Sequence, residues 1–158
     1  MKTRYGQKIL IIVKLSLFML FISLTGCHKT KIVPAESILV IKNGERIQQA
    51  KDTGGYRMAM DDIARVLSQT LLRRRIEKTT RQEIENTFQT SVNAYLLKYD
   101  RIYTMNILRE GAYTEDVPFQ KIYIIRKLDV HYIYFVVEGE PHYYPFIPFS
   151  EVTRLPRN

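Results

Sequence analysis

The sequence predicts an α+β fold: an N-terminal strand, an antiparallel helical hairpin, and then an antiparallel meander of about three strands. Three observations predict it. Hydrophobic residues make up 46% and charged residues 25% of the 158 residues, a composition typical of one folded domain. Apolar residues repeat with helical spacing in the middle of the chain, and β-branched and aromatic runs lie on either side of it. We therefore expect the helices to cover one face of the sheet.

The first strand is predicted over residues 37–42, SILVIK, which are mostly β-branched and apolar. Asn43-Gly44 follows directly and is typical of a tight turn. Residues 45–51 are polar and favour no single element, and the sequence DTGG at 52–55 indicates a break.

A first helix is predicted over residues 56–77, where apolar residues recur on one helical face. Asp61 and Asp62 lie in its first turns and the arginine run 73–75 lies in its last turn. Acids near the start and bases near the end complement the helix macrodipole, which stabilises a helix. The apolar face consists of Met60, Ile63, Ala64, Leu67 and Leu71.

A second helix is predicted to begin at residue 79 and to continue to about residue 108. Thr80 followed by Glu83 resembles a capping box. Few residues separate the two helices, so they are expected to pair as a hairpin. At about 42 Å the second helix is long for this chain, so it must bend, end near Asp100 or project beyond the core. Its apolar stripe consists of Ile84, Phe88, Val92, Tyr95, Tyr99, Ile102 and Tyr103.

Three strands are predicted in the last part of the chain, over residues 120–128, 130–138 and 142–149. Pro145 and Pro148 lack an N–H, so the third strand should be an edge or a broken strand. The turn at 138–141 places Ile133 opposite Phe146. Both faces of the middle strand are apolar, so either structure covers both or one is an interaction surface.

The N-terminal 26 residues have the pattern of an export signal. They contain four basic residues and no acid, and residues 9–24 are apolar apart from Lys14 and two serines. The uninterrupted apolar run covers only 15–24, which is shorter than the roughly 20 residues that a transmembrane helix needs. A retained N-terminal anchor is the alternative.

The end of this segment, Leu24-Thr25-Gly26-Cys27, resembles the lipobox of bacterial lipoproteins. The resemblance covers residues 1–27. It implies that Cys27 receives a diacylglyceryl group, that the signal is cut before it, and that the new amino group is acylated, for example with palmitate. Two or more acyl chains give stable anchoring in a bilayer. The alternative for Cys27 is an ordinary small apolar residue; as the only cysteine, it has no disulfide partner in the chain.

The resemblance also implies a location and a division of the chain. The residue after Cys27 is His28 and not Asp, which in that family favours the outer membrane, and the basic run that follows favours its periplasmic face. We expect a signal peptide over 1–26, a tether over 27–37, a single α+β domain over 38–150 and a polar tail over 151–158. The only cofactor expected is the covalent lipid on Cys27.

Charge does not predict a nucleic-acid partner. Four of the +8 formal charges fall within residues 1–26, which leaves a modest +4 for the remainder. The densest basic cluster either meets lipid head groups or an acidic partner, or is a solvated helix end, and the second interpretation is favoured. For the tyrosines, a role in the core and on the faces of the sheet is the favoured alternative to a sticky surface. The candidate interaction surface consists of Arg73, Arg74, Arg75, Lys78, Arg81, Tyr132 and Tyr134.

No catalytic or metal-binding constellation is recognisable in the sequence. His131 and His142 are too few for a metal site, and helix starts and turns explain the acidic pairs. We therefore predict a non-enzymatic accessory or structural component of a bacterial envelope assembly, such as a type VI-like secretion system. The alternative is a periplasmic binding module for a small ligand, a lipid or a cell-wall fragment, which requires a concave pocket.

Overall fold

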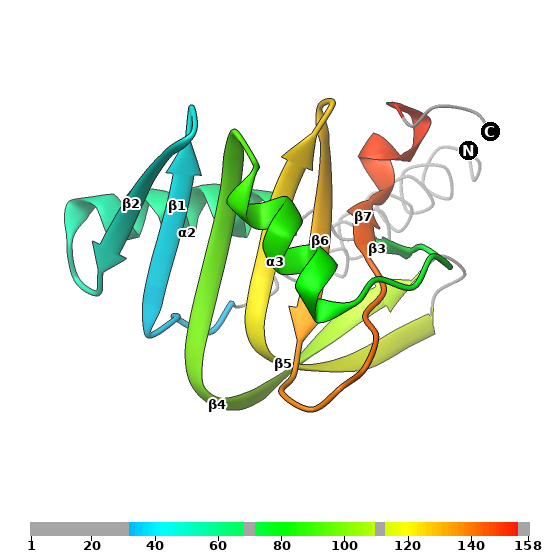
Figure 1. The fold of residues 1–158 in the computed structure, drawn as a ribbon. Helices are drawn as coiled ribbons and strands as arrows, with labels where there is room; N and C mark the ends of the chain where they lie inside the picture. Colours follow the sequence, from blue (N-terminus) through cyan, green and yellow to red (C-terminus); the bar gives the residue numbers. More distant parts are fainter. Residues whose placement is uncertain (1–31, 68–71, 110–112, 155–158) are drawn as a thin grey trace, which may run out of the picture.

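The computed structural model describes residues 32–67, 72–109 and 113–154. One seven-stranded antiparallel sheet dominates this part of the chain, with strand order β2-β1-β4-β5-β6-β7-β3 (Figure 1). Two α-helices and one 3-10 helix complete it. The elements are β1 (Ser37–Lys42), β2 (Glu45–Ala50), α2 (Gly54–Leu67), β3 (Leu72–Arg74), α3 (Arg81–Gln89), β4 (Asn93–Arg109), β5 (Tyr113–Lys127), β6 (Val130–Val136), β7 (Phe146–Pro148) and η1 (Phe149–Arg154).

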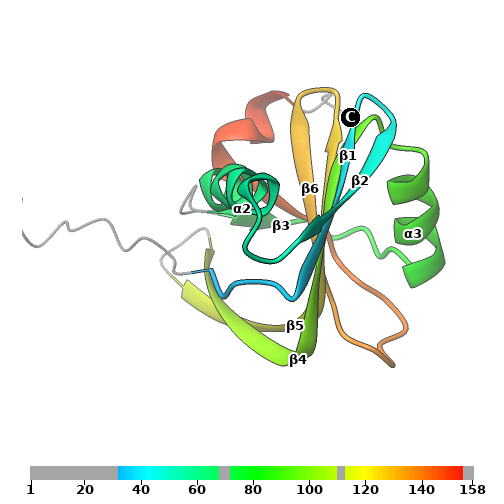
Figure 2. The same ribbon diagram turned by 90° about the vertical axis from the view of Figure 1, so that its left-hand side faces the viewer.

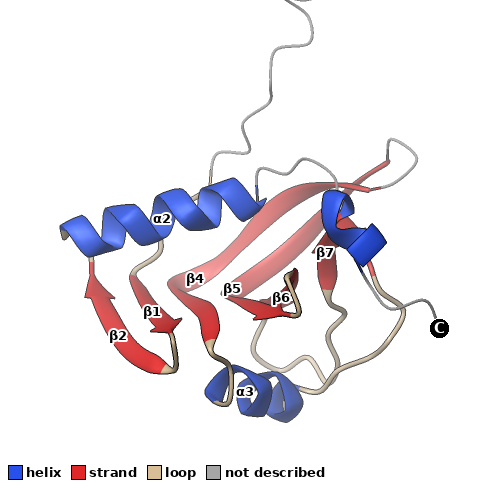
Figure 3. Cartoon of the chain, turned by 90° about the horizontal axis from the view of Figure 1, so that it is seen from above, coloured by secondary structure: helices blue, strands red, loops and turns tan. Residues whose placement is uncertain are grey.

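The predicted fold class is wrong, because the helical hairpin does not form. The first helix is shorter than predicted and ends at Leu67. Of the three arginines expected in its last turn, Arg73 and Arg74 lie on strand β3 and Arg75 follows it. The second helix ends at Gln89, and the rest of its predicted stripe is β4, the longest strand. The described residues therefore form a large sheet with one helix on each face, as Figure 3 shows from above.

A shared spacing explains the error at β4. Tyr95, Tyr99 and Tyr103 are four residues apart, and a spacing of four fits one face of a strand as well as one face of a helix. The intervening odd-numbered Leu97 packs in the same core as these tyrosines, whereas Ala94 and Leu96 belong to the core on the other face. This alternation is the period of two that defines a strand, and the helical interpretation overlooked it.

Several local predictions are confirmed. Residues 37–42 form β1, and Asn43 and Gly44 form the turn to β2 with positive φ angles of 53° and 81°. The capping box forms: the Thr80 backbone N–H donates to Glu83 Oε2 at 2.7 Å, and the Glu83 N–H donates to Thr80 Oγ1 at 3.3 Å. Such a cap is worth about 1 kcal/mol of helix stability.

The proline-containing strand is broken, as predicted, although it is not an edge. Only Phe146–Pro148 form β7, which pairs with β6 on one side and with β3 on the other. Ile133 faces Phe146 as the predicted turn requires. Residues 151–154, which belong to the segment expected to be a polar tail, lie in η1.

The sheet is strongly curved, and its curvature divides the core in two. β4 and β5 bend where their register shifts, between Lys98 and Tyr103, and their far halves curl toward the side on which α2 lies (Figure 2). The larger core fills the space between α2 and this concave face, and a smaller core lies under α3. Structure therefore covers both faces of β6. None of the described helices has the length and hydropathy to cross a bilayer.

Candidate functional site

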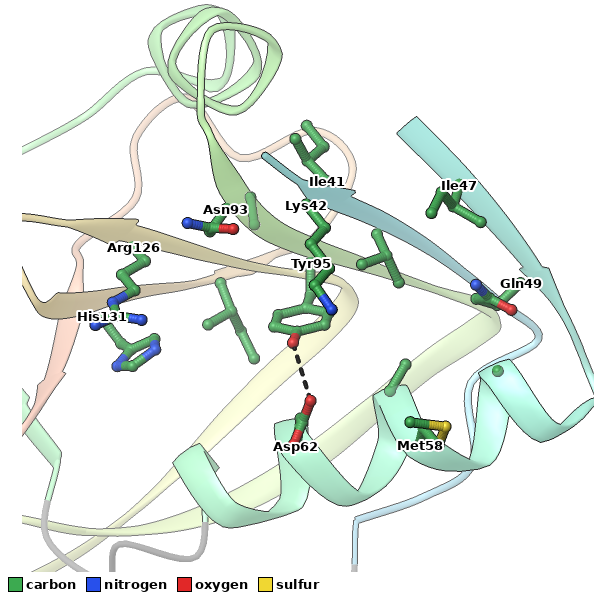
Figure 4. A pocket seen from close by; sticks show the side chains of 15 residues that line it. Ile41, Lys42, Ile47, Gln49, Met58, Asp62, Asn93, Tyr95, Arg126 and His131 are labelled. Atoms are coloured by element: carbon green, nitrogen blue, oxygen red, sulfur yellow. Dashed lines mark hydrogen bonds between the residues drawn. The ribbon is translucent and has the colours of Figure 1, made fainter. Parts of the chain in front are cut away.

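A groove lies between α2 and the concave face of the sheet. It consists of a cavity of about 370 Å³ and a neighbouring one of about 290 Å³, which share Asp62, Tyr95, Arg126 and His131 in their walls (Figure 4). We call the two together the α2 groove. Cavities of a few hundred Å³ are the size that small-molecule sites use.

The floor of the α2 groove is apolar. It is formed by Val40 of β1, Tyr95 of β4 and Ile124 of β5, which point to the same face because side chains alternate along each strand. Met58 and Ala59 of α2 form the facing wall. Met58 is 72% exposed, an unusual position for a large apolar side chain, and this leaves apolar surface open at the mouth of the groove.

One side of the α2 groove is polar, because a row of polar side chains crosses four strands beside the apolar floor. Lys42 pairs with Asn93 between β1 and β4, and Arg126 pairs with His131 between β5 and β6. Asn93 precedes Ala94, which pairs with Ile125, so the two pairs are neighbours across the sheet. Figure 4 shows Lys42, Arg126 and His131 extending from the sheet toward α2. We call these four residues the polar row.

His131 is held by a buried carboxylate from the C-terminal part of the chain. Glu151 of η1 is 5% exposed and is the only buried charged residue among those that the structure describes. Its Oε1 accepts from His131 Nδ1 at 2.8 Å and its Oε2 accepts from the His131 backbone N–H at 2.7 Å. A carboxylate only accepts, so Nδ1 carries a proton and Nε2 is the ring nitrogen left to meet a ligand.

The charges around the α2 groove are partly compensated. Asp62 on α2 pairs with Arg65 at 2.6 Å and accepts from the Tyr95 hydroxyl at 3.4 Å. Burial, followed by the negative charge of Asp62, raises the pKa of Tyr95, so this phenol stays neutral at physiological pH. Arg126 donates to Asp129 in the turn after β5. On the sheet side, Lys42, Arg126 and His131 line the groove and each has a carboxylate nearby, and the helix side carries Asp62 paired with Arg65.

The side chains that line the α2 groove can hold a ligand through apolar contacts and hydrogen bonds. The described residues that line the α2 groove include no Ser, Thr or Cys that His131 and Glu151 could activate as a nucleophile. No cluster of three or more His, Cys, Asp or Glu in the described ranges could hold a metal ion. What the groove offers a ligand is an apolar floor, hydrogen-bond donors and positive charge.

The basic residues predicted as an interaction surface do not gather at one helix end, because Arg73 and Arg74 lie on β3 and Arg81 begins α3. Arg74 of β3 pairs with Glu115 at 3.1 Å and stacks over the ring of Tyr144. Arg75 pairs with Glu77 at 2.7 Å, and Arg81 pairs with Glu85 at 2.9 Å. These three arginines therefore have carboxylate partners of their own. Lys78 and Arg73 are exposed.

The two tyrosines predicted for the same surface lie against the core under α3. Tyr134 is 6% exposed and belongs to that core, and Tyr132 is half-buried against it. Tyr134 is therefore closed to a partner in this structure. Cys27, the predicted lipidation site, lies outside the described residues.

The polar row was missed in the sequence, although a signal for it exists. Arg126 stands two residues after Ile124, His131 two before Ile133, and Lys42 two after Val40. Each is a polar residue at a position where the strand alternation calls for an apolar one. That break in alternation, at the same end of three strands, marks the row.

Comparison with known proteins identifies no relative: the chain matches no protein-family model, no curated protein and no solved structure.

Proposed function

We propose that this protein is a lipid-anchored component of the bacterial envelope that works by binding, and that the α2 groove is its ligand site. The observation that carries the proposal is the groove itself, with its apolar floor and a polar row along one side. This combination is typical of sites for small, largely apolar ligands that are oriented by a few polar groups. The binding role is non-enzymatic and needs no cofactor other than the lipid on Cys27.

The anchor rests on residues 1–27, where a basic start, a short apolar run and Leu24-Thr25-Gly26-Cys27 follow one another in the order of a lipoprotein signal. The predicted tether over 27–37 is short. Since an extended chain spans at most about 3.5 Å per residue, Ile32, where the described structure begins, lies within roughly 20 Å of a lipid-anchored Cys27. A binding site so close to the membrane has ready access to lipids and to cell-wall fragments.

Replacing the lipidated sulfur tests the anchor. We expect Cys27→Ser to abolish incorporation of labelled palmitate and to leave the protein unprocessed, whereas the natural chain is labelled and fractionates with outer membranes. Absence of palmitate label in the natural chain would refute the anchor and leave the groove untouched.

Filling the groove tests the site. Ala59→Phe places a ring in the groove from α2, and Val40→Phe does so from the sheet. Both are expected to abolish binding of apolar ligands by the full chain in lipid nanodiscs. Ile102→Phe, at a 56% exposed position that does not line the groove, is the matched control. Thermal melts of each variant separate loss of binding from loss of folding, and unchanged binding in both folded variants would refute the site.

A second candidate function, an adaptor in an envelope assembly such as a type VI-like secretion system, is favoured by strand β2. β2 is one edge of the sheet, and it pairs only with β1 among the described residues. Such an edge can accept a strand from a partner. Gln48→Pro, at an exposed position of β2 that does not line the groove, disrupts this edge, and loss of a co-purifying partner without loss of groove binding would support this role.

A further inference from the structure

We infer that the polar row is a carboxylate site, and that the ligand of the α2 groove is a single-chain amphiphile whose apolar chain lies on the groove floor and whose carboxylate is held by Arg126 and His131. This inference rests on the proposed function, because it assigns the chemical class of the ligand.

The placement of Arg126 and His131 supports the inference. They are directly opposite each other on β5 and β6. Residues opposite one another in an antiparallel pair have Cβ atoms about 5 Å apart, so one carboxylate can reach both side chains. Arg126 uses one of its five N–H groups on Asp129 and presents a planar fork that matches a carboxylate.

His131 is prepared for the same ligand by Glu151. Both oxygens of that buried carboxylate are used by His131, one by Nδ1 and one by the backbone N–H. The ring is thereby fixed in orientation, and Nε2 is the ring nitrogen that can meet a head group in the groove. Fixing a side chain before binding lowers the entropy lost on binding.

The surrounding charges favour a ligand with a single negative charge. Glu45 stands opposite Lys42 in the β1–β2 pair, Asp62 lies across the groove with Arg65, and Asp129 and Glu151 lie behind the row. Four carboxylates therefore stand near Lys42, Arg65, Arg126 and His131. A doubly charged head group would meet more repulsion than a carboxylate does.

The apolar floor of the groove favours a ligand with an apolar chain. Ile124, Tyr95 and Val40 pair with one another across β5, β4 and β1, and this apolar row leads away from Arg126 and His131 toward Ile47 on β2, where Met58 is also exposed. A flexible alkyl chain can lie along this path and remove their apolar surface from water. The path is thus apolar along its length, with Arg126 and His131 at one end of it and the rest of the polar row along one side.

Three probes with the same eight-carbon chain test the inference: octanoate, octanol and octylammonium. The full chain in lipid nanodiscs is titrated with each by calorimetry, and empty nanodiscs are subtracted. We expect octanoate to bind at least about tenfold more tightly than octanol, because hydrogen bonds to a charged group stabilise more than those between neutral groups, and octylammonium to bind most weakly.

Two variants locate the carboxylate. Arg126→Gln is expected to weaken octanoate binding about tenfold and to leave octanol binding unchanged, and His131→Gln is expected to do the same. Arg101→Gln, at an exposed position that does not line the groove, is the matched control. Since Arg126 is exposed, its variant should fold, and a thermal melt checks this.

The outcomes separate this inference from the proposed function. If octanol binds as tightly as octanoate, the groove remains a ligand site and the carboxylate site is refuted. A preference for octanoate that survives both Arg126→Gln and His131→Gln refutes the location of the site. If none of the three probes binds, the groove is not a site for such ligands, and the proposed function fails with the inference.

Discussion

The two faces of the sheet are covered by helices in different ways. On one face, the nine-residue α3 presses Ile84 and Phe88 onto Tyr123 and Ile125, and all four side chains are buried. On the other face, the longer α2 leaves the upper part of β1, β4 and β5 open as a groove. The comparison shows that a helix can cover a sheet without filling the space between them, and that the unfilled space coincides with the polar row.

The largest expected difference between the two faces is in the loss of folding stability when a side chain is truncated. Phe88→Ala should destabilise the protein by about 3–5 kcal/mol, because it empties a closed core and removes the edge-on contact with Tyr123 at 5.4 Å. Val40→Ala, on the groove floor, should cost less than about 1.5 kcal/mol. Urea unfolding of both variants measures this, and equal costs would mean that the groove floor is packed like the α3 face.

A smaller loss of stability is expected when the contact between Glu151 of η1 and His131 of the groove is removed. Glu151→Ala leaves the His131 backbone N–H and Nδ1 without their acceptor, which should cost about 1–3 kcal/mol. Glu140→Ala, an exposed acid, should change stability by less than about 0.5 kcal/mol and serves as the control. NMR of the His131 ring should show loss of the protected Nδ1 proton in Glu151→Ala only. An unchanged ring signal would contradict the pairing.

The smallest expected effect on stability at neutral pH concerns Tyr123, which lies in the core under α3. The same residue should have a clear effect on stability at high pH. Burial raises its pKa to about 12. The unfolded chain releases this proton near pH 10, so stability is complete below pH 10 and falls as the pH rises from 10 to 12. Tyr123→Phe should flatten this fall without changing the stability difference between pH 7 and pH 9. Urea unfolding across this range tests it, and an unaltered slope would contradict the burial argument.

Short-range features of this protein were predictable from its sequence, and long-range pairings were not. The Asn43-Gly44 turn and the Thr80–Glu83 capping box depend on residues within one turn of each other, and both form. The sequence of β3 was predicted to end a helix. It is a strand because it pairs with β7, which is its neighbour in the sheet but lies more than 70 residues later in the chain. Tertiary context overrode helix propensity there.

The candidate site was harder to predict for the same reason. Its four polar residues come from β1, β4, β5 and β6, and their adjacency depends on the register of three strand pairs. Glu151 adds a contact from η1 that no local pattern indicates. Conversely, the basic run at 73–75 stands out in the sequence, yet Arg74 and Arg75 are each neutralised by a nearby acid.

The pairing of β3 with β7 has a consequence for how the chain is made. Leu72 is buried and its partner is Pro148, so this edge of the sheet cannot close until nearly the whole chain has been synthesised. Contacts so distant in sequence slow folding. If the proposed N-terminal export signal operates, late closure of this edge would leave the chain unfolded enough to pass through a translocation channel.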